Sequence, residues 1–309
     1  MVLSTAIAES SLVDHSSVEN AYQVAQAAIK SSVPPLLWEE NERFVSRIRA
    51  NLKTHPLLTH PFLLALQQGK FNREQLKKIH LEYRHAIVEI FTDTLLAAQL
   101  QARQLEPRLQ RGSKLYARFI LGLNLFDEYG FQPGTQAGGY QGDPNNAHYL
   151  LFEEVLDELG ISATEREAYV PSQASRELRQ ALEGVYDDLT STVALLAIAE
   201  AAVAFTMSLR DNARLAGLDV NTGFFKCHGF TYEEETVGVD DFHELGLWYV
   251  LMQALTPDQY PKILELGDRY CDLWAAFYDA QLELLEETTD RHFVGSRNRL
   301  DSPSLVAVA

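Results

Sequence analysis

Apolar side chains recur every three to four positions along most of the chain, between about residues 37 and 290. For example, Phe44, Ile48 and Leu52 fall on one face of an expected helix. No stretch alternates apolar and polar residues for long enough to predict a convincing strand. The pattern therefore predicts an all-α protein.

Cap and turn residues indicate where several of these helices begin and end. Asn72 and Gln75 have the spacing of a capping box, and helical spacing continues from there to about Gln104. Gly130 and Gly160 each follow a helical stretch, the position at which glycine commonly ends a helix. These signals predict one long helix over 72–104 and two shorter helices that end at the glycines.

The periodic region has no composition break or fixed repeat that would divide it. We therefore expect residues 37–290 to form a single helical domain. Residues 1–36 are rich in Ser, Ala and Val and end in Ser-Ser-Val-Pro-Pro, which predicts an N-terminal arm with one short helix. Residues 291–309 are predicted to form a flexible tail.

One apolar stretch, residues 189–209, contains Glu200 as its only ionisable side chain. The stretch is long enough to cross a membrane, but a central Glu and several Ser and Thr residues favour a buried core helix. Glu200 has apolar neighbours on every side of that helix, so we expect it to be buried. A buried carboxylate must be protonated, paired with a core Arg or Lys, or bound to a metal.

A second carboxylate, Glu82, precedes His85 by three residues in the predicted long helix. Side chains three apart share a helix face, so both can bind one metal ion. The same spacing recurs at Asp240 and His243, about as often as chance allows in a chain with 43 acidic residues. The alternative for His85 is a surface histidine paired with Glu82 or Glu89.

His228 lies shortly before Asp240 and His243. With Glu82, His85 and Glu200, these residues give three imidazoles and three carboxylates, a donor set that suits iron or manganese better than structural zinc. Each of the later three also has a structural explanation: His228 as a loop residue, Asp240 as a helix cap and His243 as a surface residue. The sequence leaves these alternatives open.

Charge and cysteine content limit the possible partners and compartment. The chain has 26 Lys and Arg against 43 Asp and Glu, a net charge of −17, which disfavours nucleic acid as a partner. Two cysteines without CxxC spacing support neither a disulfide framework nor a thiolate zinc site. Because no export signal precedes the helical region, we expect a cytoplasmic protein without a membrane span. Motifs of serine hydrolases, P-loop proteins and dinucleotide enzymes are absent.

Several segments in order resemble the heme-oxygenase-like diiron oxidase and oxygenase superfamily. They are His60-Pro-Phe-Leu-Leu-Ala-Leu, Glu82-Tyr-Arg-His85, Asn124-Leu-Phe-Asp-Glu-Tyr-Gly130 and His148-Tyr-Leu-Leu-Phe152. The second half is most similar to the CADD-like branch and to the branch that converts a fatty acid to a terminal alkene. The resemblance implies a seven-helix bundle, a fold shared with thiaminase II and pyrroloquinoline quinone synthase.

The same resemblance implies a two-iron site, with manganese as the other metal considered. Its metal ligands would be Glu82, His85, Glu200, His228, Asp240 and His243. In the resembled family a His lies four residues before the Asp, a position that Thr236 occupies here, whereas His228 lies twelve residues before Asp240. Twelve residues on a straight helix span about 18 Å, so His228 reaches the site only if an insertion lets the chain return. Otherwise Glu233 or Glu235 would replace it, or the site would be incomplete.

The function implied by this resemblance is O2-dependent oxidation of a small amino-acid or fatty-acid type substrate, by C–C cleavage or N-oxygenation, with a homodimer typical of the family. Arg84 and Arg210 are candidates to hold a substrate carboxylate. Two alternatives remain: a metal-free helical interaction protein of the CADD-like kind, and a cofactorless enzyme like thiaminase or quinone synthase.

Overall fold

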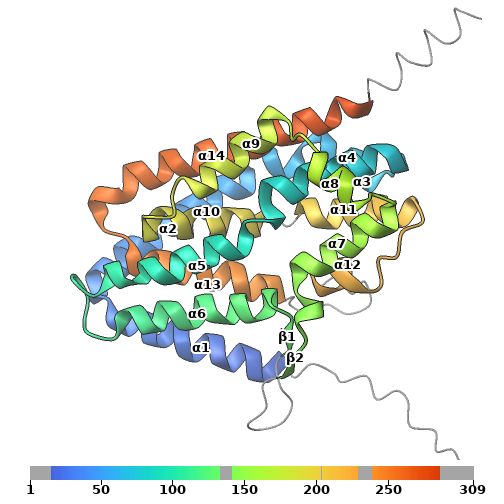
Figure 1. Cartoon of the computed structure of the whole chain (residues 1–309). Helices are drawn as coiled ribbons and strands as arrows, with labels where there is room; N and C mark the ends of the chain where they lie inside the picture. Colours follow the sequence, from blue (N-terminus) through green and yellow to red (C-terminus); the bar gives the residue numbers. More distant parts are fainter. Residues whose placement is uncertain (1–14, 133–140, 203, 229–238, 286–309) are drawn as a thin grey trace, which may run out of the picture.

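A computed structural model describes residues 15–132, 141–202, 204–228 and 239–285 of the chain (Figure 1). Within these residues the protein is built of helices, so the all-α prediction is confirmed. The exception is one antiparallel pair of two-residue strands, β1 (Phe131–Gln132) and β2 (Gln141–Gly142).

The helical segments are more numerous than the seven expected, because several long stretches are interrupted. In chain order, the described α-helices are α1 (His15–Ser32), α2 (Pro35–Thr54), α3 (Pro61–Gln67), α4 (Arg73–Tyr83), α5 (Phe91–Gln101), α6 (Ser113–Glu128), α7 (His148–Leu159), α8 (Ala163–Ala168), α9 (Gln173–Glu183), α10 (Leu189–Ala201), α11 (Ala204–Leu215), α12 (Gly223–Cys227), α13 (Val239–Ala254) and α14 (Tyr260–Leu282).

Helix α10 forms the centre of the bundle. It packs against α5, α13 and α14, and its residues 189–198 are all buried. Helix α14 lies on the opposite side of the molecule from α1 and α6, which run side by side (Figure 1). An element buried on all sides must be apolar around its whole circumference, which explains why residues 189–198 of α10 carry no charge.

The stretch Leu189–Leu215, which covers α10 and α11, is long and apolar enough to cross a membrane by length and composition. Its most apolar window is 75% buried inside the protein. That burial agrees with the core helix expected from the sequence.

Part of the predicted N-terminal arm packs into the bundle. The expected short helix is present as α1, which contacts α6 and α13 and buries Tyr22 and Ile29. The structure therefore places this helix in the body of the protein. The predicted tail, residues 291–309, lies outside the described residues.

Two interruptions break helices that the sequence pattern predicted to be continuous. Five residues in a π-helical turn, Arg84–Val88, separate α4 from α5, and Ala202 ends α10 just before α11. Irregular turns of this kind are frequent at functional sites. Both interruptions lie beside the same cavity, described below.

Cap signals read from the sequence are found where expected. Asn72 and Gln75 form a reciprocal capping box at the start of α4. Gly130, just after α6, has a positive φ of 80°, and a Cβ there would lie 2.5 Å from the Asp143 carbonyl oxygen. Glycine at this position lets the chain return closely to the end of α6, which brings the start of α7 beside it.

His80 makes the stability of the fold depend on pH. It is fully buried, and burial lowers its pKa from 6.5 to about 4. The unfolded chain takes up a proton below about pH 6.5 while the folded protein does not, so stability falls as the pH falls from 6.5 towards 4. At about pH 5, His80 therefore lowers the free energy of unfolding by about 2 kcal/mol, because each unit of pKa difference corresponds to about 1.36 kcal/mol.

Urea unfolding of the natural protein and of His80→Asn at about pH 7.5 and about pH 5 measures this effect. Asn keeps an N–H donor for the Leu76 carbonyl, which His80 Nδ1 contacts at 2.7 Å, but it has no titratable group. The variant is expected to lose about 2 kcal/mol less than the natural protein over this range. Equal losses would contradict the assignment to His80.

Candidate metal centre

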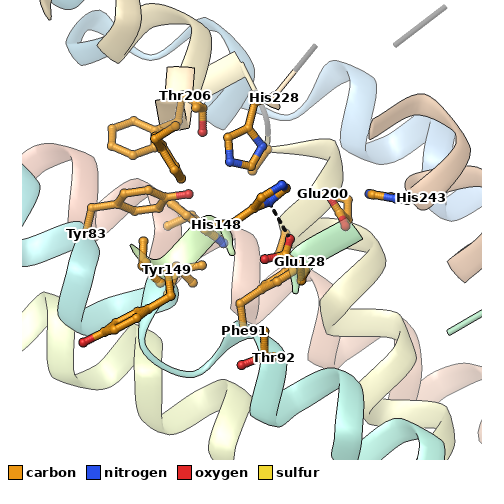
Figure 2. Close-up of a pocket in the computed structure, with 17 residues that line it drawn as sticks. Tyr83, Phe91, Thr92, Glu128, His148, Tyr149, Glu200, Thr206, His228 and His243 are labelled. Carbon is orange, nitrogen blue, oxygen red and sulfur yellow. Dashed lines mark ion pairs between the residues drawn. The ribbon is translucent and has the colours of Figure 1, made fainter. Parts of the chain in front are cut away.

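A cavity of about 60 Å³ lies where α6, α7, α10 and α13 meet the end of α12 (Figure 2). Two carboxylates and three imidazoles line it, each from a different element. They are Glu128 on α6, His148 on α7, Glu200 on α10, His228 immediately after α12 and His243 on α13.

Glu128 and His148 form a buried ion pair at the centre of this group. Oε1 of Glu128 lies 3.2 Å from Nδ1 of His148, and both side chains point into the cavity (Figure 2). Burial alone would raise the pKa of Glu128, but the positive charge of His148 holds it below its usual value. In return, Glu128 overcomes the effect of burial and holds the pKa of His148 well above its usual value.

A neighbouring carboxylate, Asp127, lies between two of the imidazoles. Its Oδ2 is 3.7 Å from Nε2 of His148 and 3.9 Å from Nε2 of His243. A carboxylate beside a ligand histidine commonly fixes the orientation and tautomer of the ring. Both distances are longer than a hydrogen bond, so Asp127 faces the two rings as a nearby negative charge.

Glu200 accepts a hydrogen bond from Asn124 Nδ2 at 3.0 Å. Asn124 is buried, and its Oδ1 has no hydrogen-bond partner among the described residues. The sequence predicted that Glu200 is fully buried, but its side chain is half-buried. The reason is that Glu200 faces the cavity at the point where α10 is interrupted. Asn124, Asp127 and Glu128 are spaced so that all three share one face of α6.

His228 reaches the cavity from the end of α12, whereas His243 reaches it from α13. Its ring centroid lies 4.9 Å from that of His148 and 4.5 Å from that of Phe224. The insertion that the sequence predicted before Asp240 falls on residues 229–236, outside the described residues. His228 nevertheless lines the cavity opposite α13, so the helix geometry that would have excluded it does not apply.

The rest of the wall is mainly apolar and aromatic. Two turns of chain contribute most of it, the π-helical turn after α4 and the break between α10 and α11. The lining side chains there and on neighbouring helices are Tyr83, Ile87, Val88, Phe91, Ala199, Ala202, Phe205, Phe224 and Trp274. This wall limits access of water to the polar group.

Of the six residues predicted as ligands, the structure brings Glu200, His228 and His243 together. Asp240 belongs to the first turn of α13, but its side chain lies outside the described residues.

Glu82 and His85 lie elsewhere, and this corrects the expectation that they share the centre. Glu82 accepts hydrogen bonds from Tyr169 Oη and from the backbone and side chain of Ser172. It therefore anchors the segment that leads into α9. His85 lies in the π-helical turn, and its Nδ1 is 3.9 Å from Oε2 of Glu89. Burial, and to a smaller extent the positive charge of Arg179, lowers the pKa of His85.

Arg84 was a candidate to hold a substrate carboxylate. Its guanidinium instead pairs with Glu89 and Glu153 and donates to Tyr149 Oη. These acidic partners make it a poor site for another carboxylate. Arg210, the other candidate, lies on α11 and is not among the cavity-lining residues.

Sequence reasoning missed Asp127, Glu128 and His148. All three occur in segments that carried the family resemblance, so the signal was present. A position at a helix start accounts for His148 without a metal, and the pair 127–128 does not stand out among the 43 acidic residues of the chain. Glu128 and His148 lie 20 positions apart, which is not a metal-ligand spacing, so they meet only through the packing of α6 against α7.

The donor set fits a centre of two metal ions. Mixed imidazole and carboxylate ligands suit iron and manganese. Glu128 and Glu200 lie among three histidines in this arrangement (Figure 2). Asn124 Oδ1, a buried polar atom that has no hydrogen-bond partner within the part of the chain that the structure describes, adjoins the same group.

Comparison with known proteins agrees with the fold. No protein-family model matches the sequence. The chain is 26% identical over 247 residues to the 4-aminobenzoate synthase of Chlamydia muridarum. The aligned region covers 79% of this chain and 92% of that protein. Two crystal structures of a CADD-like protein of unknown function from Nostoc punctiforme match with TM-scores of 0.54 and 0.52, at 15% and 12% identity. Each covers 81% of this chain and at least 97% of the other.

These similarities agree with the helical fold that the sequence segments suggested. The structural match establishes a shared fold, and the sequence match is to a protein named as an enzyme. The branch within the superfamily stays a prediction.

Proposed function

We propose that this protein is an oxidoreductase that uses two iron ions to activate O2 and oxidise a compact organic substrate. The observation that carries the proposal is the convergence of Glu128, His148, Glu200, His228 and His243 on one cavity. No local sequence pattern requires five separate elements to bring their donor groups together. A shared ligand explains the convergence.

The proposed ligands are these five residues, with Asp240 as a sixth if its side chain reaches the cavity. When bound, the two ions would supply the reduction of O2 and the oxidation of substrate. Glu128 and Glu200 would balance their charge. His148 must release its proton before it binds, so its raised pKa predicts tighter metal binding as the pH rises.

Neighbouring residues would hold the ligands in position and keep the site dry. Asn124 orients Glu200 through its 3.0 Å hydrogen bond, and Asp127 faces both His148 and His243. The aromatic wall, which includes Phe205 and Phe224, would exclude water from the reacting groups.

Cavity size favours a compact substrate. A volume of about 60 Å³ holds only a few water-sized groups, since one water needs about 10 to 15 Å³ measured in this way. A long fatty-acid chain would require the wall to move, whereas a small amino acid or aromatic acid requires less. The name of the Chlamydia muridarum relative, 4-aminobenzoate synthase, also points to a compact molecule.

The protein is also proposed to act in the cytoplasm. Cys227 and Cys271 are both free thiols in the structure, which suits a reducing compartment. A homodimer is part of the same proposal.

Oxygen consumption tests the proposed activity. Protein loaded with Fe(II) is compared with protein loaded with Zn(II), which has the same charge but no redox chemistry. The iron form is expected to consume O2 faster, and a compact amino or aromatic acid should increase the rate more than a long-chain fatty acid. Equal O2 consumption by the iron and zinc forms would contradict the proposal.

A further inference from the structure

We propose that Cys227 supplies a thiolate ligand to the metal centre, together with His148 and His228. This inference rests on the proposed function and extends it, because it adds a sulfur donor to an otherwise nitrogen and oxygen set. It also makes the two ends of the centre chemically different.

The three donor atoms already lie close together. One ring nitrogen each of His148 and His228 and the Cys227 Sγ all lie within 4.8 Å of one another. Metal–nitrogen and metal–sulfur bonds of about 2.1 and 2.3 Å allow two ligands of one ion to be up to about 4.4 Å apart. Small side-chain movements therefore suffice for all three to bind one ion.

The end of α12 explains why consecutive residues face the same point. Cys227 is the last residue of that short helix, and His228 follows it as the C-cap, with φ −78° and ψ 22°. Since α12 packs against α7, both side chains approach His148, the first residue of α7. The rings of His148 and His228 meet edge to face, with centroids 4.9 Å apart.

The Cys227 thiol is available for this role. It is half-buried, forms no disulfide and donates a hydrogen bond to the Phe224 carbonyl oxygen at 3.1 Å. Binding a metal would replace this weak hydrogen bond, and the thiol's contact with His148, by a metal–sulfur bond. The thiol proton leaves to solvent, and no oxidation or reduction takes place in this step.

A Cys227 ligand would give the two halves of the centre different donor atoms and therefore different metal preferences. The half with Cys227, His148 and His228 has soft and borderline donors, which favour Fe(II), Co(II) or Zn(II) over Mn(II). The half near Glu200 and His243 has harder donors. We therefore expect one ion to bind more tightly than the other and manganese to compete poorly for the sulfur half.

Cobalt spectroscopy tests the thiolate without relying on enzyme activity. Co(II) bound to a thiolate gives a charge-transfer absorption that nitrogen and oxygen ligands do not give. The metal-free protein, Cys227→Ser and Cys271→Ala are each titrated with Co(II), and the bound cobalt is counted. Cys271 is the only other cysteine in the chain, and its side chain is buried in the core. Cys271→Ala is therefore the matched control.

The natural protein and Cys271→Ala are expected to show the charge-transfer band, and Cys227→Ser to lose it. Cobalt affinity of Cys227→Ser should fall by at least about tenfold, the loss that even an outer-shell change causes. Because Cys271→Ala contains a single cysteine, its band assigns the ligand even if Cys227→Ser does not fold.

The two hypotheses fail in different ways. Cobalt bound to the natural protein without the band, or a band that survives Cys227→Ser, would overturn the thiolate ligand and leave the metal centre intact. Failure to bind cobalt or iron at all would instead overturn the proposed function.

Discussion

Glu200→Ala is expected to bind well under one iron ion per chain while remaining folded. The natural Glu200 side chain faces three histidines and a second carboxylate across the cavity, so its loss removes a ligand and part of the charge that balances two cations. Bound iron after anaerobic loading and gel filtration, together with the urea unfolding midpoint, measures both consequences.

Glu265→Ala is a suitable control, because Glu265 is exposed on α14 and lies outside the cavity. It should bind iron like the natural protein. If Glu200→Ala kept its iron and instead lost about 3 to 5 kcal/mol of stability, Glu200 would be half of a structural ion pair. That result would remove Glu200 from the proposed metal ligands.

Glu82→Ala is expected to show the reverse: normal iron content and a loss of about 2 to 4 kcal/mol in the free energy of unfolding. Glu82 is buried and accepts hydrogen bonds from Tyr169 and from both the N–H and the hydroxyl of Ser172. Its removal leaves half-buried donors without their acceptor, at up to about 1 to 3 kcal/mol each. Urea unfolding and metal analysis of the same preparation give both quantities.

Glu82→Gln provides the matched comparison, since its amide oxygen still accepts hydrogen bonds from Ser172. Its stability loss should be smaller than that of Glu82→Ala. Loss of iron in Glu82→Ala, with the cavity residues unchanged, would return Glu82 to the metal centre where the sequence first suggested it.

Helix ends were predictable because their causes are local. A capping box needs only Asn72 and Gln75, and the end of α6 needs only a glycine that tolerates positive φ. The interruptions were not predictable in the same way. The π-helical turn of Arg84–Val88 carries no glycine or proline, and it depends on packing against α9.

The candidate metal centre was only partly predictable for the same reason. Glu200 stood out because one carboxylate in an apolar helix demands an explanation, and His243 and His228 followed from the resemblance. The spacing of Glu82 and His85 shows only that they can share a face, not which face meets the cavity. Glu128 and His148 meet through tertiary packing across a loop, which no sequence interval encodes.

The central claim is that this cavity binds two iron ions that react with O2. Metal-free protein is titrated with Fe(II) under anaerobic conditions, bound iron is counted, and the absorbance is recorded before and after exposure to O2. The account predicts about two irons per chain and a change in absorbance when O2 is added. Well under one iron per chain, with no absorbance change, would contradict it.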